Sequence, residues 1–251
     1  MNMQESVVAV SPHWHGPKLL ATCASEVVAA KARDFPSGSV RRDQNRKIGV
    51  VPTPFGAMEL SVWKDPFTSD AIECCVYTGV LLGEHEDYRG DARFTYYKRA
   101  KGYDWLSDRG LRLCMDAHSE DAIALYELLA SETGNDAAMD FNMEGLLFAD
   151  RVRIAPEYRG SAAWKALYFC TMSAVFAHQK RCCEHFTFFA HPFLSQEDNA
   201  PDDPAKLAQG ARDLRRFYAV HLDAKVIRTA AGPTGYMRAP VPDAIWTAFA
   251  P

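Results

Sequence analysis

The residues from Arg153 to Leu167, RIAPEYRGSAAWKAL, combine an arginine, a glycine and several small residues where the periodicity of the sequence changes. The run before them, LLFADRVRIA (146–155), is apolar and β-prone, and the run after them has apolar residues at helical spacing. A turn of small residues between a strand and a helix leaves backbone N–H groups at the helix N-terminus able to face an anion. The spacing therefore predicts an anion-binding turn at Arg159 and Gly160.

Length and composition are those of an ordinary globular protein. The chain has 251 residues, enough for one large domain, with 48% hydrophobic and 24% charged residues. The net charge of −4 does not indicate a nucleic-acid-binding protein, and no run of apolar residues is long enough to predict a membrane span. We expect no secretory signal, and the seven cysteines, none in a Cys-x-x-Cys pair, favour reduced thiols and a cytoplasmic location.

Strand patterns dominate the first half after residue 45. Residues 57–82 predict a hairpin of two strands around KDPFTSD, and residues 92–100 and 110–115 are further strand candidates. The segment 119–133 predicts a helix capped by Ser119.

The second half alternates strands and helices. We predict a strand at 145–155, a helix at 161–178, a strand at 185–191, a helix at 205–222, and a closing pair of strands. This order indicates the α/β fold class, mixed and α+β-like, with a central mixed β-sheet flanked by helices.

Three motifs follow one another here: ADRVRIAPEYRGSAAWKAL, then FTFFAHPF, then DLRRFYAVHLDAKVI. Together they resemble the core of the GNAT superfamily of acyl-CoA N-acyltransferases, over roughly residues 143–228. The resemblance implies a single GNAT-like domain in residues 46–251, preceded by a helical extension in residues 1–45. It further implies acyl transfer, most simply of acetyl, from acetyl-CoA or another acyl-CoA as co-substrate to a primary amine, by direct attack in a ternary complex.

The resemblance also assigns the residues that would bind acyl-CoA. In the family the pyrophosphate lies on the turn after the fourth strand, and backbone N–H groups of that strand hold the acyl-pantetheine arm. Here the strand positions are Val152, Arg153 and Ile154, and the turn consists of Arg159, Gly160, Ser161, Ala162, Ala163 and Trp164. Ala162 replaces a glycine and Trp164 replaces a small residue. The indole either narrows the path of the cofactor, stacks on it, or turns into the core.

Asp150 is the candidate general base. By alternation along the strand it shares a face with Val152 and Ile154, unless a bulge intervenes. A carboxylate in a partly buried cleft can act as a base in amine acylation. The alternative is a structural carboxylate that pairs with Arg151, Arg153 or a nearby helix end.

Tyr218 is the candidate general acid, because it matches the helix-borne tyrosine that protonates the leaving thiolate in the family. The alternative is a tyrosine of the core. The family's Leu-Gly-Phe after this tyrosine is not kept, since the chain continues Val-His-Leu-Asp at residues 220–223. Phe217 is therefore the neighbouring alternative for the position.

Several further expectations remain open. The catalytic reading competes with a catalytically inactive GNAT-fold interaction or regulatory module, and the amine acceptor is a small molecule or a protein. The acidic loop GEHEDYRGD (83–91) is expected to be solvated or, if it borders the cleft, to attract a cationic amine. Exposed strands near the C-terminus favour a homodimer. His13 with His15, and the cluster CCEH at 182–185, lack the spacing of a known zinc module, so no metal is expected.

Overall fold

The computed structural model describes most of the chain after residue 45. The helical extension predicted for residues 1–45, the loop at 133–140 and nearly all of the loop at 192–204 lie outside the described residues. The residues described are 46–64, 72–99, 109–131, 145–179, 183, 185–190, 204–229 and 231–249.

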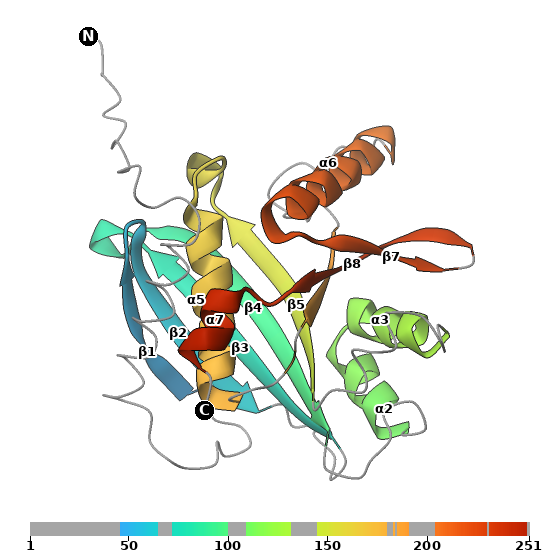
Figure 1. The fold of residues 1–251 in the computed structure, drawn as a ribbon. Coiled ribbons are helices and arrows are strands. Elements are labelled where there is room, and N and C mark those ends of the chain that lie inside the picture. Colours follow the sequence, from blue (N-terminus) through green and yellow to red (C-terminus); the bar gives the residue numbers. More distant parts are fainter. Residues whose placement is uncertain are drawn as a thin grey trace.

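An eight-stranded sheet in the order β1-β2-β3-β4-β5-β6-β8-β7 forms the centre of the molecule (Figure 1). All neighbouring strands are antiparallel except β5 and β6, which are parallel. The sheet confirms the predicted fold class, and β7 forms one of its two edges. The strands are β1 Arg46–Thr53, β2 Gly56–Lys64, β3 Ile72–Leu82, β4 Tyr88–Arg99, β5 Gly145–Ile154, β6 His185–Phe189, β7 Lys225–Thr229 and β8 Gly232–Pro240.

Helices lie against both faces of this sheet. The face that carries Leu147 and Ala149 packs against α5, and the face that carries Leu146 and Phe148 packs against α2 and α3. The helices are α2 Arg109–His118, α3 Glu120–Ser131, α5 Ala163–Gln179, α6 Pro204–Leu222 and α7 Asp243–Ala248, with short 3-10 turns at Glu84–Glu86 and Pro156–Tyr158.

Most predicted elements are confirmed. The hairpin of β2 and β3 forms as expected, as do β5, α5, β6, α6 and the closing pair of β7 and β8. The predicted cap of α3 is also present, because the hydroxyl of Ser119 accepts a 3.0 Å hydrogen bond from the amide of Ala122.

The strand predicted at residues 110–115 is wrong, because this segment belongs to α2. A strand would place Leu113 and Met115 on one face, yet Leu113 is 61% exposed and Met115 is completely buried. Met115 packs with Leu125 and Tyr126 of α3 in a second core cluster. A short apolar run fits either structure, and here packing against a neighbouring helix decides between them.

Residues 83–91 were expected to form a solvated loop, and this expectation is wrong for residues 88–91. β4 begins at Tyr88, so Asp91 lies within a strand and only 7% of it is exposed. Asp91 becomes important below, because two arginines of β5 surround it.

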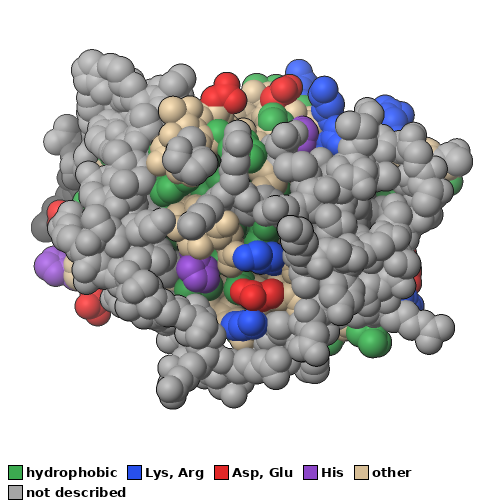
Figure 2. Space-filling model, turned by 60° about the horizontal axis from the view of Figure 1, so that its bottom comes forward, with side chains coloured by type: hydrophobic (Ala, Val, Ile, Leu, Met, Phe, Trp, Pro, Cys, Tyr) green, Lys and Arg blue, Asp and Glu red, His purple; other side chains and the backbone are tan. Residues whose placement is uncertain are grey.

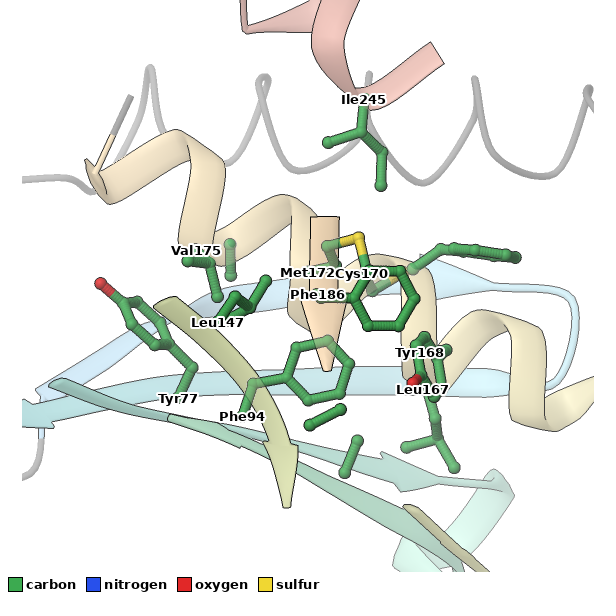
Figure 3. Packing of buried hydrophobic residues seen from close by; sticks show 14 of the residues in the cluster. Tyr77, Phe94, Leu147, Leu167, Tyr168, Cys170, Met172, Val175, Phe186 and Ile245 are labelled. Carbon is green, nitrogen blue, oxygen red and sulfur yellow. The ribbon is translucent and has the colours of Figure 1, made fainter. Parts of the chain in front are cut away.

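The main core lies between α5 and the sheet. Every residue of α5 from Ala166 to Ala177 is buried, so this helix is covered by protein on all sides. Figure 3 shows side chains of α5 above Tyr77 and Phe94 of the sheet. This packing fixes the helix whose N-terminus forms the predicted anion site.

Charged side chains of both signs lie where β2 ends and β3 begins. Lys64, at the end of β2, forms a 3.2 Å ion pair with Glu73, near the start of β3. Figure 2, which looks at the bottom of the molecule of Figure 1, shows acidic side chains between basic ones beside a histidine. Close by in sequence, the buried Tyr77 hydroxyl lies 2.6 Å from Nδ1 of His178, at the end of α5.

Gly79 of β3 permits the close approach of α5 to the sheet. A Cβ atom at this position would lie 2.4 Å from Oγ1 of Thr171 and 2.3 Å from Cε of Met58. We therefore expect Gly79→Ala to lower the free energy of unfolding by about 1–3 kcal/mol through overpacking. Urea denaturation measures this change. Val220→Ala, on an exposed side chain of α6, is the control and should change stability by less than about 0.5 kcal/mol; equal effects would contradict the proposed close packing.

Candidate functional site

β5 contains one residue more than β4 can pair with. Arg93 pairs with Arg151 and Phe94 pairs with Ala149, so Asp150 has no partner in the ladder and forms a β-bulge. A bulge shifts the alternation of side chains by one position. The expectation that Asp150 shares a face with Val152 and Ile154 is therefore wrong, and the bulge that the prediction allowed for is present.

The shift sends neighbouring side chains to opposite faces of the sheet. Val152 and Ile154 pack against the core on the α5 face. Asp150 instead accepts a 2.6 Å hydrogen bond from Thr95, which alternates with the buried Tyr97 on the α2–α3 face. From the bulge onward, the side chains of β5 are therefore apolar on the face toward α5 and charged on the opposite face.

At the same bulge β5 separates from β6. The parallel ladder pairs Leu147 with Phe186, Phe148 with Thr187 and Ala149 with Phe188, and it ends there. No described strand pairs with β5 beyond Ala149 on this side. Along the last five residues of β5, the backbone groups on that edge therefore form no hydrogen bonds to another described strand.

The direction of these backbone groups follows from one hydrogen bond. The amide of Ala155 donates to the carbonyl of Arg89 on β4 at 3.0 Å. By alternation along an antiparallel ladder, the backbone groups of Arg153 also face β4, and those of Val152 and Ile154 face away from it. Two of the three predicted backbone positions, Val152 and Ile154, therefore present N–H groups on the open edge, and Arg153 does not.

Asp150 has partners on β4. Its carboxylate lies 3.4 Å from Nε of Arg93 and accepts the hydrogen bond of Thr95. This agrees with the alternative of an ion-paired carboxylate, although the cation is Arg93 and not Arg151 or Arg153. The side chain of Asp150 is 11% exposed, so the ion pair is largely shielded from water.

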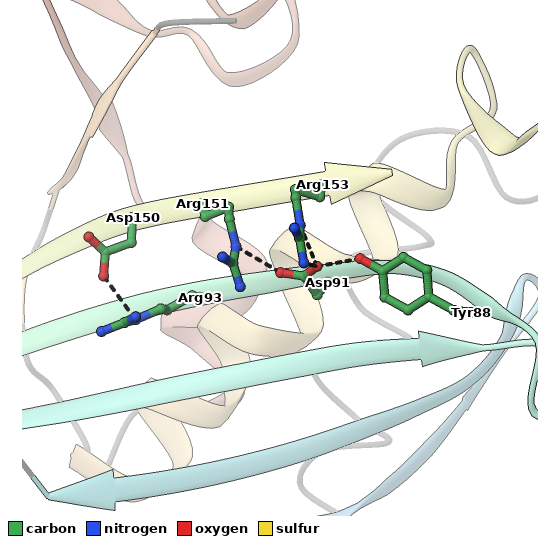
Figure 4. A network of polar contacts seen from close by, with 6 residues as sticks. All are labelled: Tyr88, Asp91, Arg93, Asp150, Arg151 and Arg153. Carbon is green, nitrogen blue, oxygen red and sulfur yellow. Dashed lines mark hydrogen bonds and ion pairs between the residues drawn. The ribbon is translucent and has the colours of Figure 1, made fainter. Parts of the chain in front are cut away.

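Arg151 and Arg153 bind a different carboxylate, that of Asp91. Arg151 donates from Nε to Oδ2 at 2.9 Å, and Arg153 donates from Nε to Oδ1 at 2.8 Å. The hydroxyl of Tyr88 donates to the same carboxylate. Figure 4 shows this network on one side of β4 and β5, and burial together with the bond to Asp91 raises the pKa of Tyr88 to about 12. From the sequence, Asp91 was expected only in an acidic loop that could border the cleft, and neither its place in a strand nor its arginine partners were predicted.

The predicted anion-binding turn leads directly from β5 into α5. Gly160 has a φ of +82°, in the left-handed region that favours glycine, and a Cβ at this position would meet no atom within 4 Å. The backbone amide of Ser161 donates to the carbonyl of Tyr158, and the amide of Ala163 donates to the hydroxyl of Ser161, both at 3.2 Å. Ser161 thus caps the first turn of α5 through its side chain.

Three amides of this turn remain available for a ligand. Among the described residues, no acceptor contacts the backbone N–H groups of Gly160, Ala162 or Trp164. The guanidinium of Arg159 donates to the carbonyl of Ile154 at 3.4 Å, which holds this exposed side chain beside the open edge of β5. An anion at this position would meet the positive end of the dipole of α5.

The indole of Trp164 is turned away from the turn and into the protein. Its ring centroid lies 5.0 Å from that of Phe217 and 5.7 Å from that of His221, both on α6. It also packs against the main core. Of the three alternatives for this residue, the structure agrees with the third, so the large side chain joins α5 to α6 and leaves the turn unobstructed by its ring.

Tyr218 lies over the point where β5 and β6 separate. Its ring is 4.8 Å from that of Phe188, the last residue of β6 that pairs with β5. Phe217, the neighbouring alternative, packs instead against Trp164. Burial raises the pKa of Tyr218 above its usual value. Asp150 and Tyr218 therefore flank the same separation point from opposite faces of the sheet.

Tyr168 of α5 brings a second phenol to this region. Its hydroxyl is buried and has no hydrogen-bond partner among the described residues. Burial raises the pKa of Tyr168 well above its usual value, and the nearby Tyr218 adds to the effect. This residue was not predicted as a site residue, because it belongs to the apolar helical pattern of α5.

The described residues contain no group of three or more His, Cys, Asp or Glu side chains that could hold a metal ion. In the same part of the chain, no helix has the length and apolar character needed to span a membrane. Four cysteines, Cys74, Cys75, Cys170 and Cys183, are buried free thiols. Burial raises the pKa of Cys75 to about 12, so this thiol is unreactive at neutral pH.

We predict opposite changes in stability when the buried residues Tyr168 and Tyr77 are each replaced by phenylalanine. Tyr168→Phe removes a hydroxyl without a partner, so we expect the free energy of unfolding to rise by about 1 kcal/mol. Tyr77→Phe removes a hydroxyl bonded to His178 and Gln179, and we expect a loss of about 1–2 kcal/mol. Chemical denaturation measures both, and a destabilised Tyr168→Phe protein would show that its hydroxyl has a partner.

No model of a known protein family matches the chain, and no curated protein matches it. The resemblance to the GNAT superfamily therefore rests on the three sequence motifs alone.

Proposed function

We propose that the chain is an acyl-CoA-dependent N-acyltransferase, most simply one that transfers acetyl from acetyl-CoA to a primary amine. One observation carries the proposal: β5 leaves β6 at a bulge and then runs, with one edge unpaired in the described sheet, to the N-terminus of α5. An acyl-CoA needs a site of this kind, because its amide-containing arm can pair with a strand edge and its pyrophosphate can bind helix amides.

The parallel unit of β5, α5 and β6 supports the same location. In sheets with parallel strands, ligands bind beyond the carboxyl ends of the strands, where the following helices begin. The three available amides of Gly160, Ala162 and Trp164 and the guanidinium of Arg159 lie at this end of β5. Together they offer a doubly charged pyrophosphate both hydrogen bonds and positive charge.

The reaction needs a base, an oxyanion site and an acid. The amine nitrogen attacks the thioester carbon, and the N–C bond forms as the C–S bond breaks. Asp150, or a water molecule beside it, takes the amine proton on the α2–α3 face. The N–H groups of Val152 and Ile154 stabilise the developing oxyanion, and Tyr218 gives its proton to the leaving thiolate on the α5–α6 face.

A specific observation favours a second candidate, a catalytically inactive GNAT-fold interaction or regulatory module. The carboxylate of Asp150 is held by Arg93 and Thr95, so it is not free in this structure to accept a proton without rearrangement. Calorimetry separates the two candidates, because an inactive module without the cofactor site would give no heat and no thermal shift with CoA.

Charge reversal at the turn tests the cofactor site. We expect Arg159→Glu to weaken CoA binding by about 10- to 100-fold, since a cation beside the pyrophosphate becomes an anion. Isothermal titration with CoA measures the affinity. Arg228→Glu, an exposed charge reversal on β7, is the matched control and should bind CoA as the unchanged protein does. Equal affinity in both variants would contradict the assignment of this turn.

Removal of the proposed acid tests the mechanism. We expect Tyr218→Phe to lower kcat by about 100-fold or more while CoA affinity is kept. Because burial raises the pKa of Tyr218, the acid stays protonated through its usual value of 10, so kcat should not fall between pH 7 and about 10. Thiol release from acetyl-CoA with a panel of amines gives both measurements, and an unchanged kcat would exclude Tyr218 as the acid.

A further inference from the structure

The charged network on β4 and β5 holds more positive than negative charge. Among the described residues, Arg151 and Arg153 share the single carboxylate of Asp91, which leaves one positive charge in excess. Arg93 lies beside them in an ion pair with Asp150. Arg93 and Arg151 are also directly opposite each other in the ladder. Like charges at such positions are unfavourable, and a bound anion would offset this cost.

Arg151 has donors to spare. Its Nε binds Asp91, and among the described residues no acceptor contacts its two terminal nitrogens. The side chain of Arg151 is 40% exposed to solvent. The two terminal nitrogens of a guanidinium match the two oxygens of a carboxylate in geometry.

Asp91 fixes the geometry of both arginines. Its side chain is 10% exposed and accepts bonds from Arg151, from Arg153 and from the hydroxyl of Tyr88. Arg153 uses Nε and Nη2 on one oxygen of this carboxylate, so its guanidinium adds charge beside Arg151 in a fixed position. An anion site held in this way needs little ordering when a ligand binds.

The network lies beside the proposed reaction point and on the face opposite the proposed acid. Arg151 is the second residue after Ala149, the last residue of β5 that pairs with β6, and Asp150 lies between them. Asp150 shares the network's face through Thr95 and Arg93 (Figure 4). Tyr218 contacts Phe188 on the other face. An amine that approaches the bulge from the α2–α3 face would pass these arginines.

We propose that Arg151, supported by Arg153 and Asp91, binds a carboxylate of the acceptor, so that the acceptor is a small amine that carries a carboxylate group, such as an amino acid. This inference rests on the proposed acyltransferase function. The excess of one positive charge at Arg151, Arg153 and Asp91 matches one carboxylate, whereas a phosphate dianion would leave a net negative charge at the site. Arg151 and Arg153 then determine specificity, and the bond-making steps stay with the groups named above.

Matched acceptors test the inference. Thiol release from acetyl-CoA is measured with amino acids and with the corresponding amino-acid amides, which have the same side chain and lack the carboxylate. We expect kcat/KM to be about 10-fold or more higher for at least one amino acid than for its amide. In Arg151→Gln the KM for that amino acid should rise by about 10-fold, and the constants for the amide should not change.

Two further variants keep the test independent of folding defects. Arg151→Lys keeps the charge and loses the fork of donors, so we expect an intermediate KM. Arg112→Gln removes an exposed arginine of α2 and should leave every constant unchanged. Circular dichroism of each variant establishes that it is folded.

A binding measurement separates the two levels of the proposal. N-acetyl amino acids and their amides are titrated into the protein in the presence of CoA. Selective binding of the carboxylate form that Arg151→Gln abolishes supports the anion site, even where no amine is acylated. Turnover with equal preference for acids and amides, or an Arg151→Gln variant that affects both alike, overturns the inference and leaves the transferase intact. Absence of both CoA binding and carboxylate binding overturns both.

Discussion

The separation of β5 from β6 at a single extra residue is the constraint on which the proposed site depends. Up to Ala149 the strand has a neighbour on each side, and its side chains alternate between two apolar cores. At Asp150 the pairing with β6 has ended, and the bulge in the pairing with β4 shifts the alternation of the side chains by one position. From this residue onward, β5 remains paired with β4. Its apolar side chains lie on the α5 face of the sheet, and its charged side chains lie on the other face.

The charged residues on this face of the sheet are stabilised by ion pairs between the two strands. A buried carboxylate with no cation would be costly, and so would a row of arginines with no anion. Asp91 with Arg151 and Arg153, and Asp150 with Arg93, satisfy this requirement within two neighbouring strands. The α2 and α3 helices cover the lower part of the same face through Met115, Leu125 and Tyr126. One face of the sheet is thus divided between apolar packing against α2 and α3 and a network of ion pairs.

The sequence predicted the elements better than their faces. Amphipathic and β-rich runs were long enough to locate the hairpin, β5, α5, β6, α6 and the closing strands. The run at 110–115 failed because six residues fit a strand or a helix equally, and only contact with α3 distinguishes them. Asp91 and the bulge at Asp150 could not be predicted, since strand register depends on pairing between residues about 60 positions apart.

The end of α6 adopts, without a glycine, the conformation in which glycine usually ends a helix. The Leu-Gly-Phe expected after Tyr218 is not kept, and the chain continues Val-His-Leu-Asp at residues 220–223. Asp223 has a φ of +51°, the left-handed conformation that glycine usually adopts after a helix, and aspartate tolerates it better than most residues do. The amide of Ala224 then donates to the carbonyl of Tyr218, and Leu222 is buried. Consecutive residues of a helix point about 100° apart, so Tyr218 faces Phe188, the last residue of β6 that pairs with β5, while Phe217 faces Trp164. The side of α6 on which a residue lies, and not the letters that follow it, therefore decides which aromatic ring contacts the end of β6.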